Sequence, residues 1–449
     1  MKNTMDMTKG NVYKILIIFA IPLLIGNIFQ LFYSLVDSII ASHMISDLAL
    51  GAIGDTSSVN SLIISFSGGM GSGASIIISR YFGEKNNDGI RKSISSIFVI
   101  NIILGILLTI SILLFLDPIL KLLSTPDNIY QMSKSYFAIT VMGLLATMMY
   151  NTLSGIIRSL GNSRVPIYVL ILTSILNVLG DIFLISVCNM GVEGCALATI
   201  ISQIISVVIL ILYIYFKYPL LRVTKEDIKF NKKIYKDILL TGLSMGLMNS
   251  VYTIGGIVMA MSVNDLGSDI ISGRTTGRKI VEVLFQPNSS IATAASVFVA
   301  QNYGAKNIKR ANEGILKSIF IVFIWCLLIL FMYILEEPLC KLISNSKNDV
   351  IIDNAVMYIK ISIPFYIFEG VLVVLRNSLQ SLGRKIIPFI SSSIELVFKI
   401  ISGLVWIPSL GFLGECITEP ISWVVCAIFC SIIYIIYYKK GVFTKNLYE

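Results

Sequence analysis

Several polar residues that can bind a cation or a proton lie inside long apolar stretches of this 449-residue chain. Asp37 follows Tyr33 by four residues and Asp181 follows Asn177 by four, so each pair shares one face of a helix. A charge at bilayer depth costs at least about 2.5 kcal/mol and is retained mainly where something offsets it. Carboxylates and an amide are hard oxygen donors that suit Na⁺, and the carboxylates alone suit a proton.

Three further residues extend this polar group. Thr199 adds a hydroxyl oxygen in the run ALAT, and Gln30 precedes Tyr33 by three residues. Pro22 lies fifteen residues before Asp37, and a proline inside a helix removes one backbone hydrogen bond and permits a bend. The alternative interpretation of the whole group is a cluster that only ties helices together by hydrogen bonds.

Ionisable residues in the second half of the chain follow a less regular pattern. Glu282, Glu369 and the pair of Glu395 and Lys399 are the candidates for a second site. Glu395 precedes Lys399 by four residues, a spacing that favours an ion pair within one helix, so we expect a structural pair there. Glu282 lies close to Lys279 and has the same alternative interpretation, whereas a binding role for Glu369 stays open.

The elements that position these residues are predicted to be membrane-spanning helices. The composition is 55% hydrophobic and 14% charged, with a mean hydropathy of +0.84. Hydrocarbon cannot satisfy backbone polar groups, so a span needs a helix of about 20 mostly apolar residues. Twelve stretches are that long: Tyr13 to Ile40, Leu50 to Ser79, Ser93 to Leu116, Tyr130 to Ile157, Pro166 to Cys188, Val192 to Phe216, Tyr235 to Val263, Val281 to Ala300, Ile315 to Leu335, Val350 to Leu375, Ile386 to Ile407 and Phe412 to Tyr438.

Basic residues predict the orientation of these helices. With both termini in the cytoplasm, 26 of the 35 Lys and Arg fall on the cytoplasmic side and eight outside, while Lys399 lies within a helix. Cytoplasmic loops retain basic residues, so we favour this topology. The net charge of +9 then reflects topology and contact with anionic headgroups of the bilayer, and nucleic-acid binding is not expected.

An internal repeat organises the chain. Ser159-Leu160-Gly161 returns as Ser381-Leu382-Gly383, and Gly83-Glu84-Lys85-Asn86 is matched by Gly304-Ala305-Lys306-Asn307. The offset of about 220 residues spans six helices, an even number, so the halves are parallel repeats. We predict an all-α integral membrane protein with two pseudo-symmetric six-helix lobes around a central cavity. The lobes are expected at residues 1–216 and 237–449, joined by a cytoplasmic linker at 217–236.

Glycines in the second predicted helix have two interpretations. Gly68, Gly69, Gly71 and Gly73 suggest a phosphate-binding loop, but they lie inside an apolar span and no Lys-Ser or Lys-Thr follows them. We therefore expect them to permit close packing of helices.

Motifs along essentially the whole chain resemble the multidrug and toxic compound extrusion (MATE) family. They are PLLIGNIFQLFYSLVD, GSGASIIISRYFGEK, IIRSLGNSRVP, LNVLGDIFLI, MGVEGCALATIISQ and FVAQNYGAKNIKRANEGI. The resemblance implies a plasma-membrane antiporter that exchanges Na⁺ or H⁺ for organic, often cationic, amphipathic compounds and moves them out of the cell. We expect no cofactor beyond Na⁺ or H⁺ as the coupling ion.

The resemblance also assigns residues to that activity. The family's cation site corresponds to Asp37, Asn177, Asp181 and Thr199, and its helix 1 tyrosine and bending proline correspond to Tyr33 and Pro22. Some members use an acidic residue in helix 10, where this chain has Glu369. We expect alternating access of a monomer, in which cation binding bends helix 1 near Pro22.

Two other classes of protein are alternatives to a drug antiporter. A flippase of lipid-linked oligosaccharides has a related fold, but its cavity is expected to need several basic residues for a pyrophosphate, and the interiors of the predicted helices offer only Lys399 securely. An intramembrane enzyme is less expected. The chain has one histidine, no HExxH and no nucleotide-binding loop.

Overall fold

The computed structural model describes residues 4–344, 346 and 348–445, and the side chain of Asp37 lies outside what it describes. The described residues form helices and connecting segments, without a strand. The first half contains α1 (Val12–Met44), α2 (Asp47–Gly83), α3 (Asn87–Leu114), α4 (Leu116–Leu122), α5 (Tyr130–Met142), α6 (Leu144–Ser159), α7 (Arg164–Ser186) and α8 (Val192–Lys217). The second contains α9 (Lys232–Val263), α10 (Ser268–Gly304), α11 (Ile308–Ile329), α12 (Met332–Ser344), α13 (Asp349–Ser362), α14 (Tyr366–Ser381), α15 (Ile386–Ile401), α16 (Ile407–Leu410), α17 (Phe412–Lys439) and α18 (Val442–Lys445).

The number of helices that can span a membrane agrees with the prediction. Among the described residues, 11 helical segments are long and apolar enough, and up to 12 if α5 and α6 form one span bent by 44°. The bend occurs at Gly143, where an added Cβ would lie 2.5 Å from Cγ1 of Ile200 in α8. Only glycine leaves room for α8 at this point, so the close packing of α8 accompanies the break in the helix.

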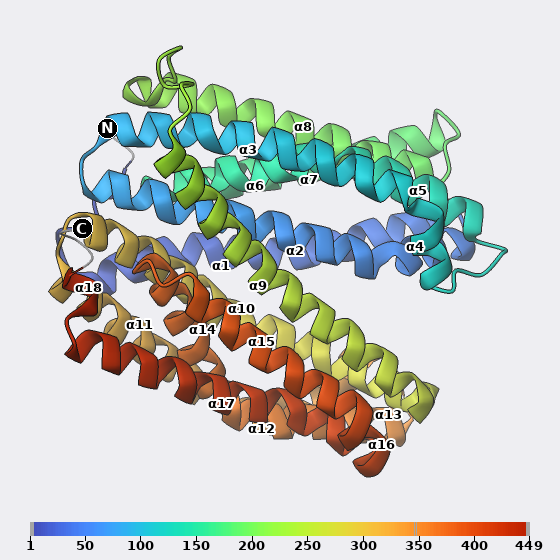
Figure 1. Cartoon of the computed structure of the whole chain (residues 1–449). Helices are drawn as coiled ribbons and strands as arrows, with labels where there is room; N and C mark the ends of the chain where they lie inside the picture. The colour runs from blue at the N-terminus through green and yellow to red at the C-terminus, as the bar shows by residue number, and fades with distance from the viewer. Residues whose placement is uncertain (1–3, 345, 347, 446–449) are drawn as a thin grey trace. The chain divides into compact units, whose positions relative to one another are not determined.

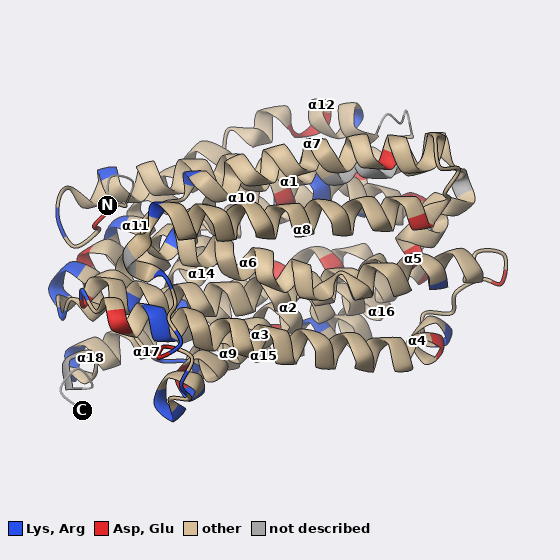
Figure 2. Cartoon of the chain, turned by 90° about the horizontal axis from the view of Figure 1, so that it is seen from above, with Lys and Arg blue, Asp and Glu red and all other residues tan. Residues whose placement is uncertain are grey.

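The chain forms two compact units. Unit 1 includes Ile25–Asn249, and unit 2 includes Met7–Leu24 and the chain from Ser250 onward, so the boundaries fall within α1 and α9. In unit 1, α2 packs along α6 and α7 packs along α8; in unit 2, α10 packs against α11, α13 and α14 (Figure 1). Figure 2 shows that most of the helical ribbon carries no charged residue, and that Lys and Arg gather near the labels of α11 and α18.

Equivalent turns in the two halves confirm the repeat. Gly161 and Gly383 both adopt left-handed backbone, with φ of 82° and 86°, and each ends a helix by donating its N–H to the carbonyl three residues earlier. Lys85 and Lys306 both have φ of 58°. The asparagine after each lysine caps the next helix: Asn86 accepts from the N–H of Gly89, and Asn307 from that of Arg310.

Close helix approaches explain most of the glycines in α2. An added Cβ on Gly71 would lie 2.7 Å from the backbone oxygen of Asn151 in α6, and one on Gly73 would lie 2.7 Å from Cα of Gly242 in α9. Gly69 makes a similar approach to α9, whereas a Cβ on Gly68 would meet nothing within 4 Å. The packing interpretation is thus confirmed at three of the four glycines and wrong for Gly68.

Alanine at Gly71 is expected to destabilise the protein, because the backbone of α6 must move to admit the methyl group. Overpacking of this kind costs about 1–3 kcal/mol. Thermal unfolding of the detergent-purified protein should show a lower midpoint for Gly71→Ala. Gly68→Ala serves as the matched control and should unfold at the wild-type midpoint; equal midpoints for both variants would contradict this packing.

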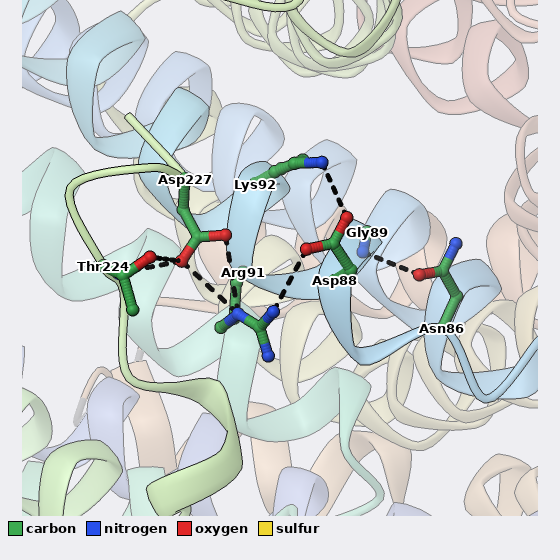
Figure 3. A network of polar contacts seen from close by, with 7 residues as sticks. All are labelled: Asn86, Asp88, Gly89, Arg91, Lys92, Thr224 and Asp227. Carbon is green, nitrogen blue, oxygen red and sulfur yellow. Dashed lines mark hydrogen bonds and ion pairs between the residues drawn. The ribbon is translucent and has the colours of Figure 1, made fainter. Parts of the chain in front are cut away.

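The connection between α8 and α9 is fixed to unit 1 by a polar network (Figure 3). Asp227, in this connection, is buried and accepts hydrogen bonds from the backbone N–H and the hydroxyl of Thr224 at 2.8 and 2.7 Å. Nε of Arg91, in the first turn of α3, lies 3.3 Å from its carboxylate. Asp88 in turn pairs with Arg91 and Lys92. The segment is therefore held against the start of α3.

Asp227→Asn is expected to loosen this connection and to speed tryptic cleavage at the exposed Lys225 and Lys229 by about fivefold, the effect of a partly exposed ion pair. The exchange Asp88→Asn removes a carboxylate from the same arginine without touching the connection, and should leave the cleavage rate unchanged. Equal rates for wild type and Asp227→Asn would show that the pair does not hold the segment.

Acid should loosen the connection in the wild-type protein. Burial raises the pKa of Asp227, but hydrogen bonds from Thr224 and the charge of Arg91 lower it by more than burial raises it. The pKa therefore lies below its ordinary value of 3.8. A carboxyl group whose pKa is lower in the folded than in the unfolded protein stabilises the fold at pH values above its unfolded-state pKa. This contribution is lost as pH falls through the lower, folded-state value, and limited proteolysis with an acid-active protease should show faster cleavage there.

Candidate functional site

Hydrogen bonds across three helices of unit 1 join two of the predicted cation ligands, Asn177 and Thr199, to Tyr33. The hydroxyl of Tyr33 in α1 donates to the amide oxygen of Asn177 in α7. The amide nitrogen of Asn177 donates to the hydroxyl of Thr199 in α8 at 3.3 Å, and this hydroxyl donates to the carbonyl of Cys195 at 3.0 Å. The sequence placed these three side chains in one group, and the structure joins them by hydrogen bonds.

Small residues allow the three helices to approach. An added Cβ on Gly180 of α7 would lie 3.2 Å from Cβ of Ala198 in α8. On α1, a Cβ at Gly26 would lie 3.0 Å from Cγ1 of Ile167 in α7. Gly180 lies three residues after Asn177, and Gly26 lies two helical turns before Tyr33. Close packing at these glycines places Asn177 within reach of its partners.

Asp181 is the buried carboxyl group of this cluster. It lies one turn after Asn177 on α7, and its side chain is 0% exposed, compared with 1% for Asn177. Asp37 lies one turn after Tyr33 in α1, with its side chain outside the described part of the structure. Asp181 thus lies on the face of α7 that carries the Asn177 side chain.

The other two predicted residues of α1 lie before Tyr33. Gln30 has an exposed side chain, and Pro22 lies inside the helix near its crossing from unit 2 to unit 1. The amide oxygen of Asn177 can accept at two positions, and the Tyr33 hydroxyl of α1 occupies one of them. One hydrogen bond therefore connects α1 directly to Asn177 of α7.

In unit 2, Glu369 is buried between α14 and α10. One carboxylate oxygen accepts from the amide of Asn288 at 2.8 Å, and the side chain is 3% exposed. Its other oxygen has no hydrogen-bond partner among the described residues. Glu282 does not join it, because its side chain is exposed on α10.

The predicted pair of Glu395 and Lys399 is confirmed as part of a larger network. Glu395 Oε1 lies 3.5 Å from Lys399 Nζ, and Glu395 Oε2 accepts from Arg376 at 2.8 Å. Lys399 Nζ also lies 3.5 Å from Glu419 Oε1. Glu395 therefore also pairs with Arg376 of α14, and Lys399 also pairs with Glu419 of α17.

The expectation that the helix interiors offer only Lys399 as a basic residue is wrong. Arg376 was placed beyond the end of a predicted helix at Leu375, but α14 continues to Ser381 and buries it. Arg274 was placed in an outer loop, but α10 begins at Ser268, and Arg274 pairs with Glu415 at 2.6 Å. Ion pairs offset the cost of these charges inside the unit, which allows the helices to extend through polar sequence.

Comparison with known proteins accounts for the repeat and the fold. A sequence profile of the MatE family matches residues 22–183 and again residues 244–405, so the two matches begin 222 residues apart, at the offset of the internal repeat. The chain is 25% identical over 404 residues to the probable multidrug resistance protein YoeA of Bacillus subtilis (strain 168), covering 87% of this chain and 85% of that protein. It is 30% identical over 308 residues to the probable multidrug resistance protein YpnP of the same strain, covering 68% of each.

The solved structures agree with the family profile. A crystal structure of MATE in complex with MaL6 superposes with a TM-score of 0.89 at 22% identity, covering 98% of this chain and 99% of that one. Its fold is therefore that of the present chain along nearly the whole length. Because the family profile covers both repeats and most of the sequence, this protein belongs to the MatE family of multi-pass membrane transporters.

Proposed function

We propose that this protein exports organic, often cationic, amphipathic compounds from the cell in exchange for Na⁺ or H⁺. The observation that carries the proposal is the hydrogen-bonded chain of the partly buried Tyr33, the buried Asn177 and the partly buried Thr199, which joins three helices inside candidate membrane spans, with the buried Asp181 one turn after Asn177. Fully buried polar and ionisable groups at this depth are costly and are typical of ion pathways. The names of the relatives YoeA and YpnP support drugs or toxic compounds as the exported cargo.

The coupling cation is assigned to Asp37, Asn177, Asp181 and Thr199. Carboxylate, amide and hydroxyl oxygens can hold Na⁺, and the carboxylates can hold H⁺. A ligand shifts a two-state equilibrium only by its differential affinity for the two states. We place this difference at Asn177, because its amide oxygen already contacts α1 through the Tyr33 hydroxyl, and we propose that α1 bends near Pro22 when the cation binds.

The orientation proposed for the protein has both termini in the cytoplasm of the plasma membrane, and the monomer is the proposed functional form. Arg91, Lys92 and the basic residues of the connection between α8 and α9 lie at the same end of unit 1. Short basic loops of this kind remain on the cytoplasmic side.

The buried basic residues of unit 2 do not favour an oligosaccharide flippase. Arg274, Arg376 and Lys399 each pair with a glutamate. Their charge is thereby compensated within the protein, so they supply no excess positive charge for a pyrophosphate. The antiporter is the function that the described residues support best.

Dye retention in cells that overproduce the protein tests the proposed export. The cells are loaded with ethidium, depleted of ATP and given an inward gradient of Na⁺ or H⁺. We expect dye to leave faster than from cells with an empty vector under at least one gradient. Equal retention under both gradients, with the protein present in the membrane, would contradict export driven by a cation.

A further inference from the structure

The side chain of Lys399 is almost fully enclosed in unit 2. It is 1% exposed, the lowest value among the paired basic side chains of the described residues. Its stem passes α9 at Gly255, where an added Cβ would lie 2.4 Å from Cδ of the lysine. Glycine at this position leaves the space that the lysine stem occupies, so packing against α9 fixes where the ammonium group lies.

Three side chains surround the ammonium group of Lys399. The centroid of the Tyr252 ring lies 4.2 Å from Nζ, and one oxygen each of Glu395 and Glu419 lies 3.5 Å away. The hydroxyl of Tyr358 donates to the second oxygen of Glu419 at 3.3 Å and so orients that carboxylate. An aromatic face combined with carboxylates is the composition with which proteins bind organic ammonium compounds. We call Tyr252, Glu395 and Glu419 the ammonium cage.

Lys399 fits this cage poorly. Short hydrogen bonds between an ammonium and a carboxylate measure about 2.7–2.9 Å, whereas both distances here are 3.5 Å. Among the described residues, Lys399 Nζ has no hydrogen-bond partner. A buried ammonium group with three donors and no hydrogen bond is held less tightly than the same group in an ideal pair. The cage is thus filled by a cation that does not satisfy it.

Two residues of the ammonium cage are partly exposed at the surface of unit 2. Tyr252 is 47% exposed, and the side chain of Glu419 is 16% exposed. Glu395 is buried and also pairs with Arg376 at 2.8 Å, so it keeps one partner when Lys399 leaves. A ligand that arrives from the surface therefore meets Tyr252 and Glu419 first.

We propose that the ammonium cage is a subsite for organic cations and that Lys399 occupies it as a tethered competitor. This inference rests on the proposed export of cationic compounds and names a place that would hold their charged group. A tethered group has an effective concentration in the millimolar range, so it returns to the cage when a ligand leaves. Lys399 thereby lowers the affinity for the cation and favours its release, which an exporter requires after each transport step.

Removal of the competitor tests the proposal. The full-length protein, purified in detergent, is titrated with benzyltrimethylammonium by isothermal calorimetry in the absence of any ion gradient. Lys399→Met keeps the length and the apolar stem of the side chain but removes its charge. We expect this variant to bind the probe at least about tenfold more tightly than wild type. Adding Glu419→Gln to Lys399→Met should abolish the gain.

A matched control separates the cage from the general loss of an ion pair. Lys341→Met breaks another Glu-to-Lys pair four residues apart, at 2.6 Å on the exposed face of α12, and should bind the probe as wild type does. If Lys399→Met does not fold, Gly255→Ala displaces the lysine stem with every charge retained and should give a smaller gain. Unchanged or weaker binding in the folded variants, or a gain that survives Glu419→Gln, would overturn the proposal.

The binding experiment and the export experiment can fail separately. Tighter binding in Lys399→Met without gradient-driven dye export would refute the antiporter and retain the ammonium cage. Gradient-driven export in wild type without tighter binding in the variant would refute the cage and retain the antiporter.

Discussion

Replacing Asp181 by Asn is expected to lower Na⁺- or H⁺-driven efflux by on the order of 100-fold. The exchange keeps the shape of a side chain that is fully buried beside Asn177, but it removes the charge that would hold the cation. Losing a buried charged ligand costs several kcal/mol, and each 1.4 kcal/mol is a factor of ten. The measurement is the initial rate of ethidium efflux from proteoliposomes. We expect the same loss for Asp37→Asn.

Asp127→Asn is the control for this prediction. It makes the same chemical change at an exposed residue of the connection between α4 and α5, and should transport at the wild-type rate. The thermal unfolding midpoint of Asp181→Asn should stay close to that of wild type, since the substitution is nearly isosteric. Undiminished efflux in Asp181→Asn would show that the buried carboxyl only ties helices together.

Replacing Arg376 by Met is expected to destabilise the protein by about 3–5 kcal/mol, the cost of leaving one member of a buried ion pair without its partner. Glu395 would retain only Lys399 at 3.5 Å in place of the bond to Arg376 at 2.8 Å. Chemical denaturation in detergent, followed by tryptophan fluorescence, measures the loss. The double exchange Arg376→Met and Glu395→Gln should recover part of it.

A surface ion pair provides the comparison for Arg376. Lys341→Met removes a partner of Glu337 in an exposed pair, and exposed pairs contribute little. Its unfolding transition should coincide with that of wild type. If Arg376→Met unfolds like Lys341→Met, the buried network of unit 2 does not stabilise the fold.

The spans, and the placement of Asn177 and Asp181 on one helix face, could be predicted because their signals are local. Helix length follows from apolar runs, and a spacing of four residues places Asn177 beside Asp181 on one face of α7. The positions that join α1, α7 and α8 came from the family resemblance, and the hydrogen bonds from Tyr33 to Asn177 and from Asn177 to Thr199 agree with that grouping.

The network of unit 2 was missed because its pairs are distant in sequence. Arg274 and Glu415 are 141 residues apart, and no local spacing indicates their contact. Polar residues at the start of α10 and the end of α14 also lower local hydropathy, which moved the predicted helix ends inward. One signal was available: Arg274 and Arg278 are four apart on α10, and Glu415 and Glu419 are four apart on α17. Opposite charges at matching intervals predict two facing helices.

The most direct test of the account is efflux from proteoliposomes that contain only this protein and an imposed gradient. Ethidium is loaded inside vesicles, and an inwardly directed Na⁺ gradient is compared with a pH gradient of the same direction, without ATP. We predict efflux above that of protein-free vesicles under one or both gradients, reduced to background by Asp181→Asn. Efflux that is equal with and without a gradient, or that persists in Asp181→Asn, would contradict cation-coupled export through this site.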